Sequence, residues 1–363
     1  MSEDVDPRDT PIHPRKRLNL IGHEAAEAKL RAAYASQRMH HAWMITGPRG
    51  IGKATLAYRF ARFILRYPNP EKLPSGNGLA VPGEDPVARQ VAASAHPDLF
   101  TLERAYDFKA KKVKTETSVV DSRRAESFFG RTAAAGGYRI CVIDTADDLN
   151  NEAANALLKT LEEPPDRGLF LLVNHSPGAL LRTIRSRCIS IELSPLSTQQ
   201  VVQASTETGI LTQEAEARRG KNDFWELPEM AVGEELQEIA AIADGSPGRV
   251  LDLIDSIGAK AFQSFLTLAA KLPKFDPIKR FDIAEMMTGR AQDRDFTLFC
   301  ELLGQWVADT ARRNALENRV SAGAWAEAHG QIAHSIRVAN ALNLDRRQVI
   351  LEAFSAIETA AGV

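Results

Sequence analysis

AWMITGPRGIGKATL, residues 42–56, joins a short apolar run to a helical pattern through a glycine-rich loop. The run at 42–46 predicts a buried strand, and the apolar spacing over 55–66 predicts a helix. The loop between them matches GxxxxGK in the strand–loop–helix context that this phosphate-binding pattern needs. Glycines let backbone N–H groups converge on phosphate oxygens, and the helix N-terminus adds partial positive charge. We therefore predict a nucleotide-binding loop formed by Gly47, Gly50, Gly52 and Lys53.

The residue that normally ligates the metal beside this loop departs from the usual pattern. Ala54 follows Lys53, where a Ser or Thr hydroxyl normally ligates Mg²⁺. Thr55 comes one residue later, and a helix turns its hydroxyl about 100° away. A nucleotide such as ATP could bind here, with Thr55 beside it, but the site is degraded and would place the metal poorly.

A second apolar run, ICVID at residues 140–144, ends on an acid in the form of a Walker B strand. Asp144 could hold a water bound to Mg²⁺. An active ATPase of this type needs a neighbouring carboxylate to polarise the attacking water, and the neighbour here is Thr145. The positions that handle metal and water are therefore both degraded, whereas the phosphate cradle remains.

The surrounding chain alternates short apolar runs with helical patterns. Such alternation predicts a parallel sheet that is covered on both faces. Further strands are predicted at 139–143, 169–173 and 189–193, and helices at 23–38, 123–130, 153–163 and 179–187. Asn150 or Asn151 is the predicted N-cap of the 153–163 helix, which Pro164 ends.

The pattern becomes almost entirely helical after Leu196, which predicts three domains. The expected divisions are a flexible tail (1–17), an α/β domain (18–194), a small helical lid (195–256) and a C-terminal helical domain (257–363). Within them, 68–97 is rich in Pro and Gly and is predicted to be an irregular insertion. Residues 205–233 are polar and charged and are predicted to form a surface insertion.

Composition excludes several classes of protein. The 363 residues carry 45 basic and 47 acidic side chains, a net charge of −2, which excludes a generally cationic nucleic-acid coat. The three cysteines form no CxxC pair, so neither a zinc site nor a disulfide framework is expected. No apolar segment follows the N-terminal MSEDVDPRDTP, and no run is long enough to span a membrane. A cytoplasmic location is expected.

Four further motifs resemble one family. They are NALLKTLEEPP at 155–165, SRC at 186–188, GSPGR at 245–249 and LNLDRRQ at 342–348. Together with the phosphate loop, they resemble the clamp-loader ATPases of the AAA+ superfamily over roughly residues 18–363. Within that group the chain resembles the delta-prime family of bacterial DNA polymerase III, and more distantly the tau/gamma motor subunits.

The resemblance implies a fold and several residue roles. It implies an α/β AAA+ P-loop module with a parallel sheet, then a small helical lid and an all-α collar domain. Arg187 matches the arginine finger, which acts in trans on the ATP of an adjacent subunit. Asn174 matches sensor 1. Arg249 matches sensor 2, which would contact the γ-phosphate of a bound nucleotide; in a degraded site a structural role for Arg249 is the equal alternative.

The resemblance also implies partners. These are the delta and tau/gamma subunits, the sliding clamp indirectly, and primer-template DNA inside the subunit spiral. Arg123 and Arg124 are candidate DNA phosphate contacts, because they are expected to begin a helix. A cluster of lysines (Lys109, Lys111, Lys112 and Lys114) on an expected hairpin is a weaker candidate. Many family members carry a four-cysteine zinc module, but 67–97 contains no cysteine, so no zinc is predicted.

We therefore interpret the chain as a stator of the clamp loader, which donates Arg187 and turns over little or no ATP itself. One alternative is an ATP-hydrolysing tau/gamma-like motor, against which Ala54 and Thr145 argue. Another is a scaffold without a finger, in which Arg187 would be a surface arginine. A small-molecule P-loop kinase is a third, but it leaves SRC and the collar unexplained.

Overall fold

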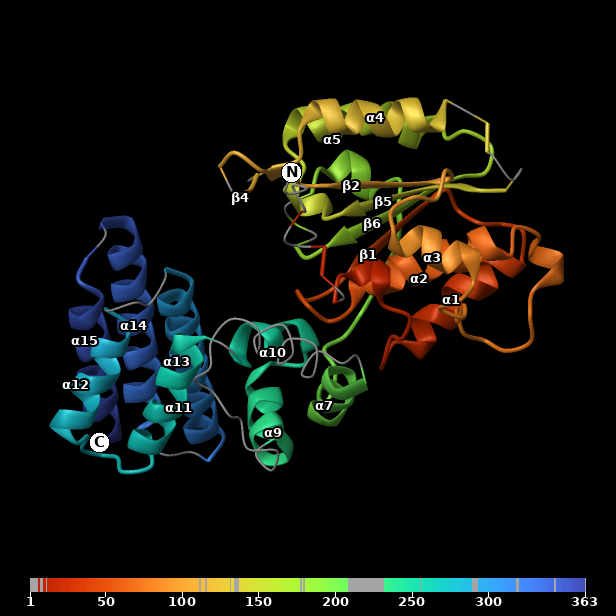
Figure 1. The fold of residues 1–363 in the computed structure, drawn as a ribbon. Coiled ribbons are helices and arrows are strands. Elements are labelled where there is room, and N and C mark those ends of the chain that lie inside the picture. Colours follow the sequence, from red (N-terminus) through yellow and green to blue (C-terminus); the bar gives the residue numbers. More distant parts are fainter. Residues whose placement is uncertain are drawn as a thin grey trace. The chain divides into compact units, whose positions relative to one another are not determined.

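The chain forms two compact units, Met1–Val250 and Leu251–Val363, in a computed structural model (Figure 1). The residues that the structure describes are 6, 9–10, 12–110, 112–114, 116–130, 132–133, 137–176, 178, 180–207, 232–254, 256–288, 293–317, 320–342 and 344–362. Most of the predicted insertion at 205–233 lies outside these residues. The separate lid domain predicted at 195–256 remains a proposal.

The first unit contains a five-stranded parallel sheet in the order β2-β5-β6-β1-β7. Its strands are β1 (Ala42–Thr46), β2 (Leu99–Glu103), β5 (Arg139–Asp144), β6 (Gly168–Asn174) and β7 (Ile189–Glu192). β1 and β6 are buried along their whole length, as expected for strands covered on both faces. The predicted parallel α/β fold is confirmed. The edge strand β2 was not predicted, because its five residues are mostly half-buried and form no continuous apolar run.

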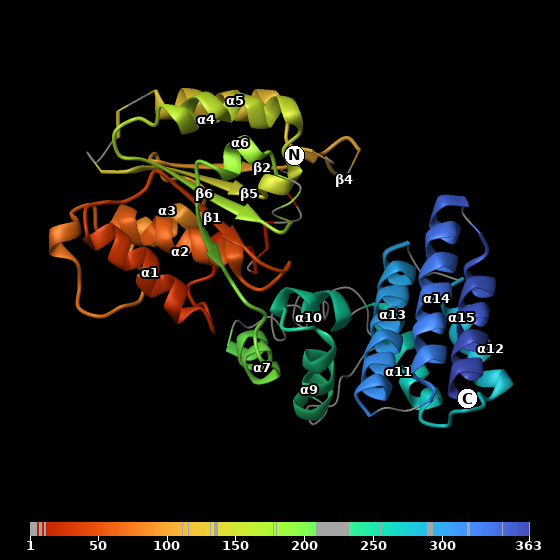
Figure 2. The same cartoon turned by 180° about the vertical axis from the view of Figure 1, so that it is seen from behind.

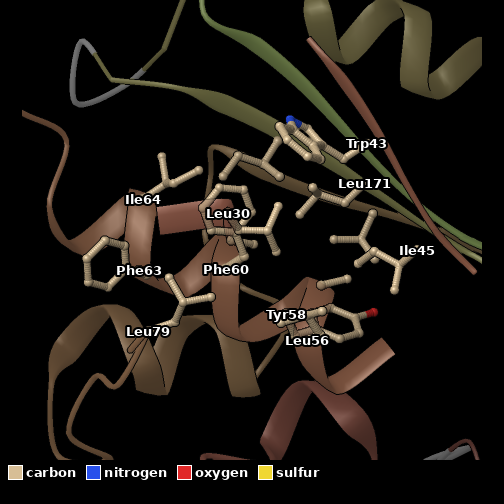
Figure 3. Packing of buried hydrophobic residues seen from close by; sticks show 14 of the residues in the cluster. Leu30, Trp43, Ile45, Leu56, Tyr58, Phe60, Phe63, Ile64, Leu79 and Leu171 are labelled. Carbon is tan, nitrogen blue, oxygen red and sulfur yellow. The ribbon is translucent and has the colours of Figure 1, made fainter. Parts of the chain in front are cut away.

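Helices cover both faces of this sheet (Figures 1 and 2). One face carries α1 (Glu24–Ala35), α2 (Lys53–Arg66) and α3 (Pro86–Ala92), and the other carries α4 (Val119–Phe129), α5 (Asn151–Glu162) and α6 (Arg182–Arg185). Leu56 and Phe60 of α2 are fully buried against Ile45 and Leu171 of the sheet (Figure 3). The side chain of Asn150 caps α5 by accepting from the N–H of Ala153 at 2.9 Å, as predicted.

The N-terminal segment differs from the flexible tail predicted over 1–17. Pro14–Lys16 forms a 3-10 turn that packs against α2 and α3. The Arg62 guanidinium, 1% exposed, donates to the carbonyl oxygens of Arg15 (2.8 Å) and Arg17 (3.2 Å). Burial lowers the pKa of Arg62 to about 10. A buried cation that needs acceptors therefore holds this segment in place.

The segment predicted as an irregular insertion, 68–97, also contains ordered structure. Asp85 caps α3 by accepting from the N–H of Val87 at 2.9 Å, and Pro86 occupies the first helical position. Leu79 is buried in the core, and its N–H donates to the carboxylate of Glu27. The Pro and Gly content therefore marks turns around a short helix rather than an irregular loop throughout.

Between β2 and α4 the chain forms a small antiparallel hairpin from β3 (Tyr106–Asp107) and β4 (Lys112–Val113). α4 then begins at Val119, with Ser118 as its N-cap. The helix predicted to begin at Arg123 thus starts four residues earlier. Arg123 and Arg124 lie in its second turn, not at its N–H end.

The described remainder of the chain is helical. The first unit continues with α7 (Thr198–Glu207) and α9 (Val232–Ile242), and α10 (Pro247–Ile254) lies at the boundary between the units. The second unit comprises α11 (Ile257–Ala269), α12 (Pro277–Met286), α13 (Asp293–Leu316), α14 (Ala322–Leu342) and α15 (Arg346–Ala361). Phe265 stacks on Phe354 at 5.4 Å in its core, and Trp306 packs edge-on against Phe265 at 5.0 Å. No helix within the described residues combines the length and apolar character needed to cross a membrane.

A matched pair of valines tests the packing of the first unit. Val142 on β5 is 0% exposed, and Val120 on α4 is 58% exposed. We expect Val142→Ala to lower the free energy of unfolding by about 2 kcal/mol, because it removes buried methyl groups and leaves a cavity. Val120→Ala should change it by less than about 0.5 kcal/mol. Urea-dependent hydrogen exchange of β5 and β6 peptides measures both, and equal effects would contradict the packing.

Candidate functional site

The glycine-rich loop lies at the carboxyl edge of the sheet, between β1 and α2. Gly47, Gly50 and Gly52 have φ values of 137°, 78° and 104°, a region that side-chain-bearing residues rarely adopt. Within the described part of the chain, no backbone N–H from Gly50 to Ala54 donates a hydrogen bond. Unused N–H donors at a helix N-terminus are suited to binding phosphate.

Lys53, the first residue of α2, points back into this loop. Its side chain is almost fully buried, and Nζ donates to the carbonyl oxygens of Gly47 (2.6 Å) and Pro48. Burial lowers the pKa of Lys53 to about 8, although Asp147 and Asp144 oppose this shift. The Lys53 ammonium thus donates to carbonyl oxygens of the same loop that is predicted to bind phosphate.

The predicted sensor 2 segment closes over the loop at the start of α10. Ser246 donates its hydroxyl to the carbonyl of Arg49 at 2.9 Å, and the Gly248 N–H donates to the carbonyl of Gly50 at 3.0 Å. A Cβ on Gly248 would lie 2.8 Å from the Cα of Gly50, so only glycine permits this approach. Arg249 is thereby brought next to the loop. Its guanidinium makes no hydrogen bond or ion pair with any described residue.

Asn174 and Asp147 occupy the same edge of the sheet. Asn174 lies opposite Thr46 of β1, so the sensor 1 candidate is beside the first residue of the loop. The Asp147 carboxylate accepts from the N–H groups of His175 (2.6 Å) and Ser176 (2.8 Å) and from the Asn174 amide (3.4 Å). Asn174 is 0% exposed, and its Oδ1 has no partner. Asp147 therefore fixes the end of β6, a role that the sequence analysis did not assign to it.

Asp144 ends β5 as predicted, and its carboxyl group has a raised pKa. Burial, together with the carboxylate of Glu103 at the register position opposite on β2, raises the pKa of Asp144 to about 6. Thr145 donates its hydroxyl to Asp148 at 3.0 Å. Glu103 thus belongs to this cluster. It was missed because it lies at the end of β2, the strand that was not predicted.

These residues fit a nucleotide phosphate better than they fit its metal. The free N–H groups of the loop, Lys53, Asn174 and Arg249 would hold the phosphates. Ala54 offers no ligand, and the Thr55 side chain is half-buried in the next position. Among the described residues, no group of three His, Cys, Asp or Glu side chains could hold a metal ion.

Arg187 contacts none of these groups. Its Nη2 lies 2.7 Å from Oε1 of Glu162, and its Nη1 donates to the carbonyl of Thr183 at 2.8 Å. Glu162 ends α5, and its side chain is 49% exposed. The predicted finger is therefore held at the surface by its own chain.

The candidate DNA contacts lie on α4. Arg123 and Arg124 are both exposed, and Arg124 forms an ion pair with Asp121 at 3.2 Å. Exposed pairs of this kind contribute little to stability, so a phosphate can compete for the guanidinium.

The segment that carries most of these residues is similar to known proteins. Residues 22–197, which include the loop, Asp144, Asn174 and Arg187, match a family model described as DNA polymerase III, delta subunit. The matched segment makes up just under half of the chain. The predicted resemblance to delta-prime subunits is confirmed by curated relatives of that name.

The DNA polymerase III subunit delta' of Pseudomonas aeruginosa is 38% identical over 149 residues, 41% of this chain and 42% of the relative. That of Escherichia coli is 33% identical over 187 residues, 52% of each. The Escherichia coli subunit tau is 27% identical over 313 residues, 85% of this chain and 44% of the relative. The chain thus spans about half the length of the curated relatives it matches.

A solved DNA polymerase III gamma subunit-related protein from Thermotoga maritima is 14% identical to this chain. The two structures superpose with a TM-score of 0.45 over 91% of this chain and 99% of the other.

Because the pKa of Asp144 is raised, ionising this carboxyl group lowers the stability of the folded chain, and the loss depends on pH. An unfolded Asp ionises near pH 3.9, whereas native Asp144 ionises near pH 6. The stability that the shift provides is present below pH 4 and is lost as pH rises through 6. We expect Asp144→Asn to be more stable than wild type at pH 7.5 by about 1–3 kcal/mol, with the difference disappearing at pH 4. Urea unfolding across this range measures it.

The control for that experiment is Asp166→Asn, which also removes one negative charge but at an exposed position. Parallel pH profiles for wild type and Asp144→Asn would contradict the assigned burial of Asp144.

A second variant tests the contact between Gly248 and the loop. Gly248→Ala places a methyl group against the Gly50 backbone, so we expect the Gly248 N–H bond to break and the loop to open. Hydrogen exchange at Gly248 should accelerate about tenfold or more, corresponding to a loss of at least about 1.4 kcal/mol. Gly178→Ala is the control, because nothing lies within 4 Å of a Cβ there. Unchanged protection in Gly248→Ala would refute the contact.

Proposed function

We propose that this chain is a delta-prime-type subunit of the DNA polymerase III clamp loader and acts as a stator, not as a motor. The observation that carries the proposal is the placement of Arg187. Its guanidinium is held at the surface by Glu162 and Thr183 and touches no residue of the chain's own phosphate loop. An arginine so placed is free to act on a nucleotide bound by another subunit.

The proposed mechanism is charge stabilisation in trans. A neighbouring tau/gamma subunit binds ATP, and Arg187 approaches the phosphoryl group that is transferred. A guanidinium there neutralises the charge that develops in the transition state. Glu162 forms an ion pair with one terminal nitrogen and the Thr183 carbonyl accepts from the other, so the side chain is oriented before the subunits meet.

The chain's own loop is proposed to bind ATP without turning it over. The N–H donors, Lys53, Asn174 and Arg249 suit the phosphates, and a nucleotide would replace the loop carbonyls as the partner of Lys53. Ala54 supplies no metal ligand, and Thr145 supplies no base for water. The pKa of about 8 leaves most Lys53 side chains charged at pH 7.

The proposed partners follow from the same assignment. The helical segment 257–363 would act as the collar that assembles with the delta and tau/gamma subunits. Those subunits would connect this chain to the sliding clamp. Arg123 and Arg124 would contact phosphates of primer-template DNA, and the assembly would work in the cytoplasm.

A tau/gamma-like motor is the second candidate. It is favoured by the intact Gly52–Lys53 pair and by the match to subunit tau over 85% of this chain. ATP turnover by the pure chain separates the two candidates. The stator proposal expects turnover no higher than that of Lys53→Ala, whereas a motor would lose its activity on that change.

The finger itself is tested in the reconstituted loader. We expect Arg187→Ala to slow DNA-stimulated ATP hydrolysis at the neighbouring site by about 10³-fold or more, the range typical of arginine fingers. Gel filtration should show unchanged assembly, because the Arg187–Glu162 pair is exposed and contributes little to folding.

Arg182→Ala is the matched control, since this exposed arginine lies on α6, which ends just before the SRC motif. It should leave hydrolysis close to wild type. An assembled Arg187→Ala loader with normal hydrolysis would reduce this chain to a scaffold and overturn the proposal.

A further inference from the structure

The hairpin between β2 and α4 has no role in the site described above. It projects from the end of β2, where β4 is labelled in Figures 1 and 2. Tyr106 pairs with Val113 across its two strands. Phe108 follows at the turn, 43% exposed, and its ring meets the Tyr106 ring edge-on at 5.1 Å. A large aromatic side chain is thus presented to solvent at the tip.

The base of this hairpin is firmly held. The Lys114 N–H donates to the carbonyl of Ala105 at 2.9 Å. One strand enters beside Arg104, whose Nε lies 2.9 Å from the Asp148 carboxylate. The other leaves past Thr117, whose N–H donates to the Asp148 carbonyl at 2.8 Å. Both legs are therefore tied to Asp148, the last residue of the 3-10 turn that comes after β5, and the tip is presented by a fixed support.

Charge on the hairpin is strongly positive. Residues 106–114 contain four lysines and one aspartate. Lys109 and Lys114 are exposed. The Asp107 carboxylate is used within the turn, where it accepts from the N–H groups of Lys109 and Ala110 at 2.9 Å. With four lysines to one aspartate, the segment keeps a net positive charge toward a partner outside the hairpin.

An exposed aromatic ring among lysines matches one kind of ligand. Phosphates attract the ammonium groups, and an unpaired base can stack on an aromatic face. A paired base cannot do so without leaving its duplex stack. Residues 106–114 also contain no Arg, Asn or Gln, the side chains that most often read base edges. The chemistry therefore favours a single strand bound without regard to its sequence.

We propose that the β3–β4 hairpin is a binding site for single-stranded DNA, with a base stacked on Phe108 and phosphates on Lys109 and Lys114. Arg123 and Arg124, on the next helix along the chain, are exposed as well. The identification of the strand as unpaired template rests on the proposed clamp-loader function, whereas the binding itself does not.

Fluorescence anisotropy of the full chain with a labelled oligothymidylate of about 16 nucleotides tests the site. We expect Phe108→Ala to raise Kd about fivefold or more, the loss typical of one stacked base. Lys109→Ala with Lys114→Ala should raise Kd and reduce the slope of log Kd against log salt by about 1.4, since each phosphate contact contributes about 0.7.

Matched controls separate binding from misfolding. Phe281→Ala removes a phenylalanine of similar exposure, 46%, from α12, and Lys29→Ala with Lys72→Ala removes two exposed lysines from elsewhere in the first unit. Neither should change Kd. An abasic strand of equal length, which has phosphates but no bases, should bind wild type and Phe108→Ala equally.

Three results would overturn the proposal. The first is an unchanged Kd in Phe108→Ala, and the second is an equal effect of that variant on the abasic strand. The third is DNA binding unaffected by every hairpin variant, with loss of loader assembly instead, which would assign the hairpin to a protein partner. None of them affects the Arg187 experiment, so the two proposals fail separately.

Discussion

β1 lies between β6 and β7 in a parallel sheet, and this position fixes the geometry of the candidate nucleotide site. Parallel strands deliver their carboxyl ends to one edge, so Thr46 and Asn174 meet there in register. Gly47 leaves β1 at that point with a backbone that only glycine adopts readily. Burial around β1 also accounts for the shifted pKa values at this edge of the sheet. Lys53 and Asp144 sit where water is scarce, and desolvation shifts the pKa of each toward its neutral form.

Two different electrostatic settings coexist in this chain. The Lys53 side chain is almost fully buried, so its charge is held by short contacts to loop carbonyls. Arg187 lies at the surface, where its pair with Glu162 is screened by solvent. A weak pair is an advantage for a group that must exchange one partner for another. A buried pair would resist that exchange, because separating it would strand a charge.

Local patterns predicted what depends on neighbours in sequence. The strand, loop and helix around Lys53 are contiguous, and the Asn150 cap needs only the next three residues. Contacts over long separations gave no such signal. Ser246 and Arg49 are 197 residues apart, and no sequence periodicity predicts the hydrogen bond between them. The edge strand β2 and the helix α3 were missed because a short half-buried strand and a Pro-rich surrounding both weaken the pattern. The proposed role of Arg187 came from the family resemblance alone, since one arginine near a helix end has no distinctive periodicity.

Arg62 has a consequence for how this protein can be handled. Its guanidinium lies in the interior, and two of its acceptors are backbone carbonyls of residues 15 and 17. Backbone acceptors cannot be removed by changing a side chain, so the anchor tolerates almost any sequence over those positions. It does not tolerate their deletion. A recombinant version trimmed to begin at Leu18 would remove both acceptors of a guanidinium that is buried in the full chain, and would uncover the surface of α2 and α3 against which Pro14–Lys16 packs. The lower limit of an autonomous α/β unit is therefore set upstream of the first helix, by a segment that contributes nothing to the sheet.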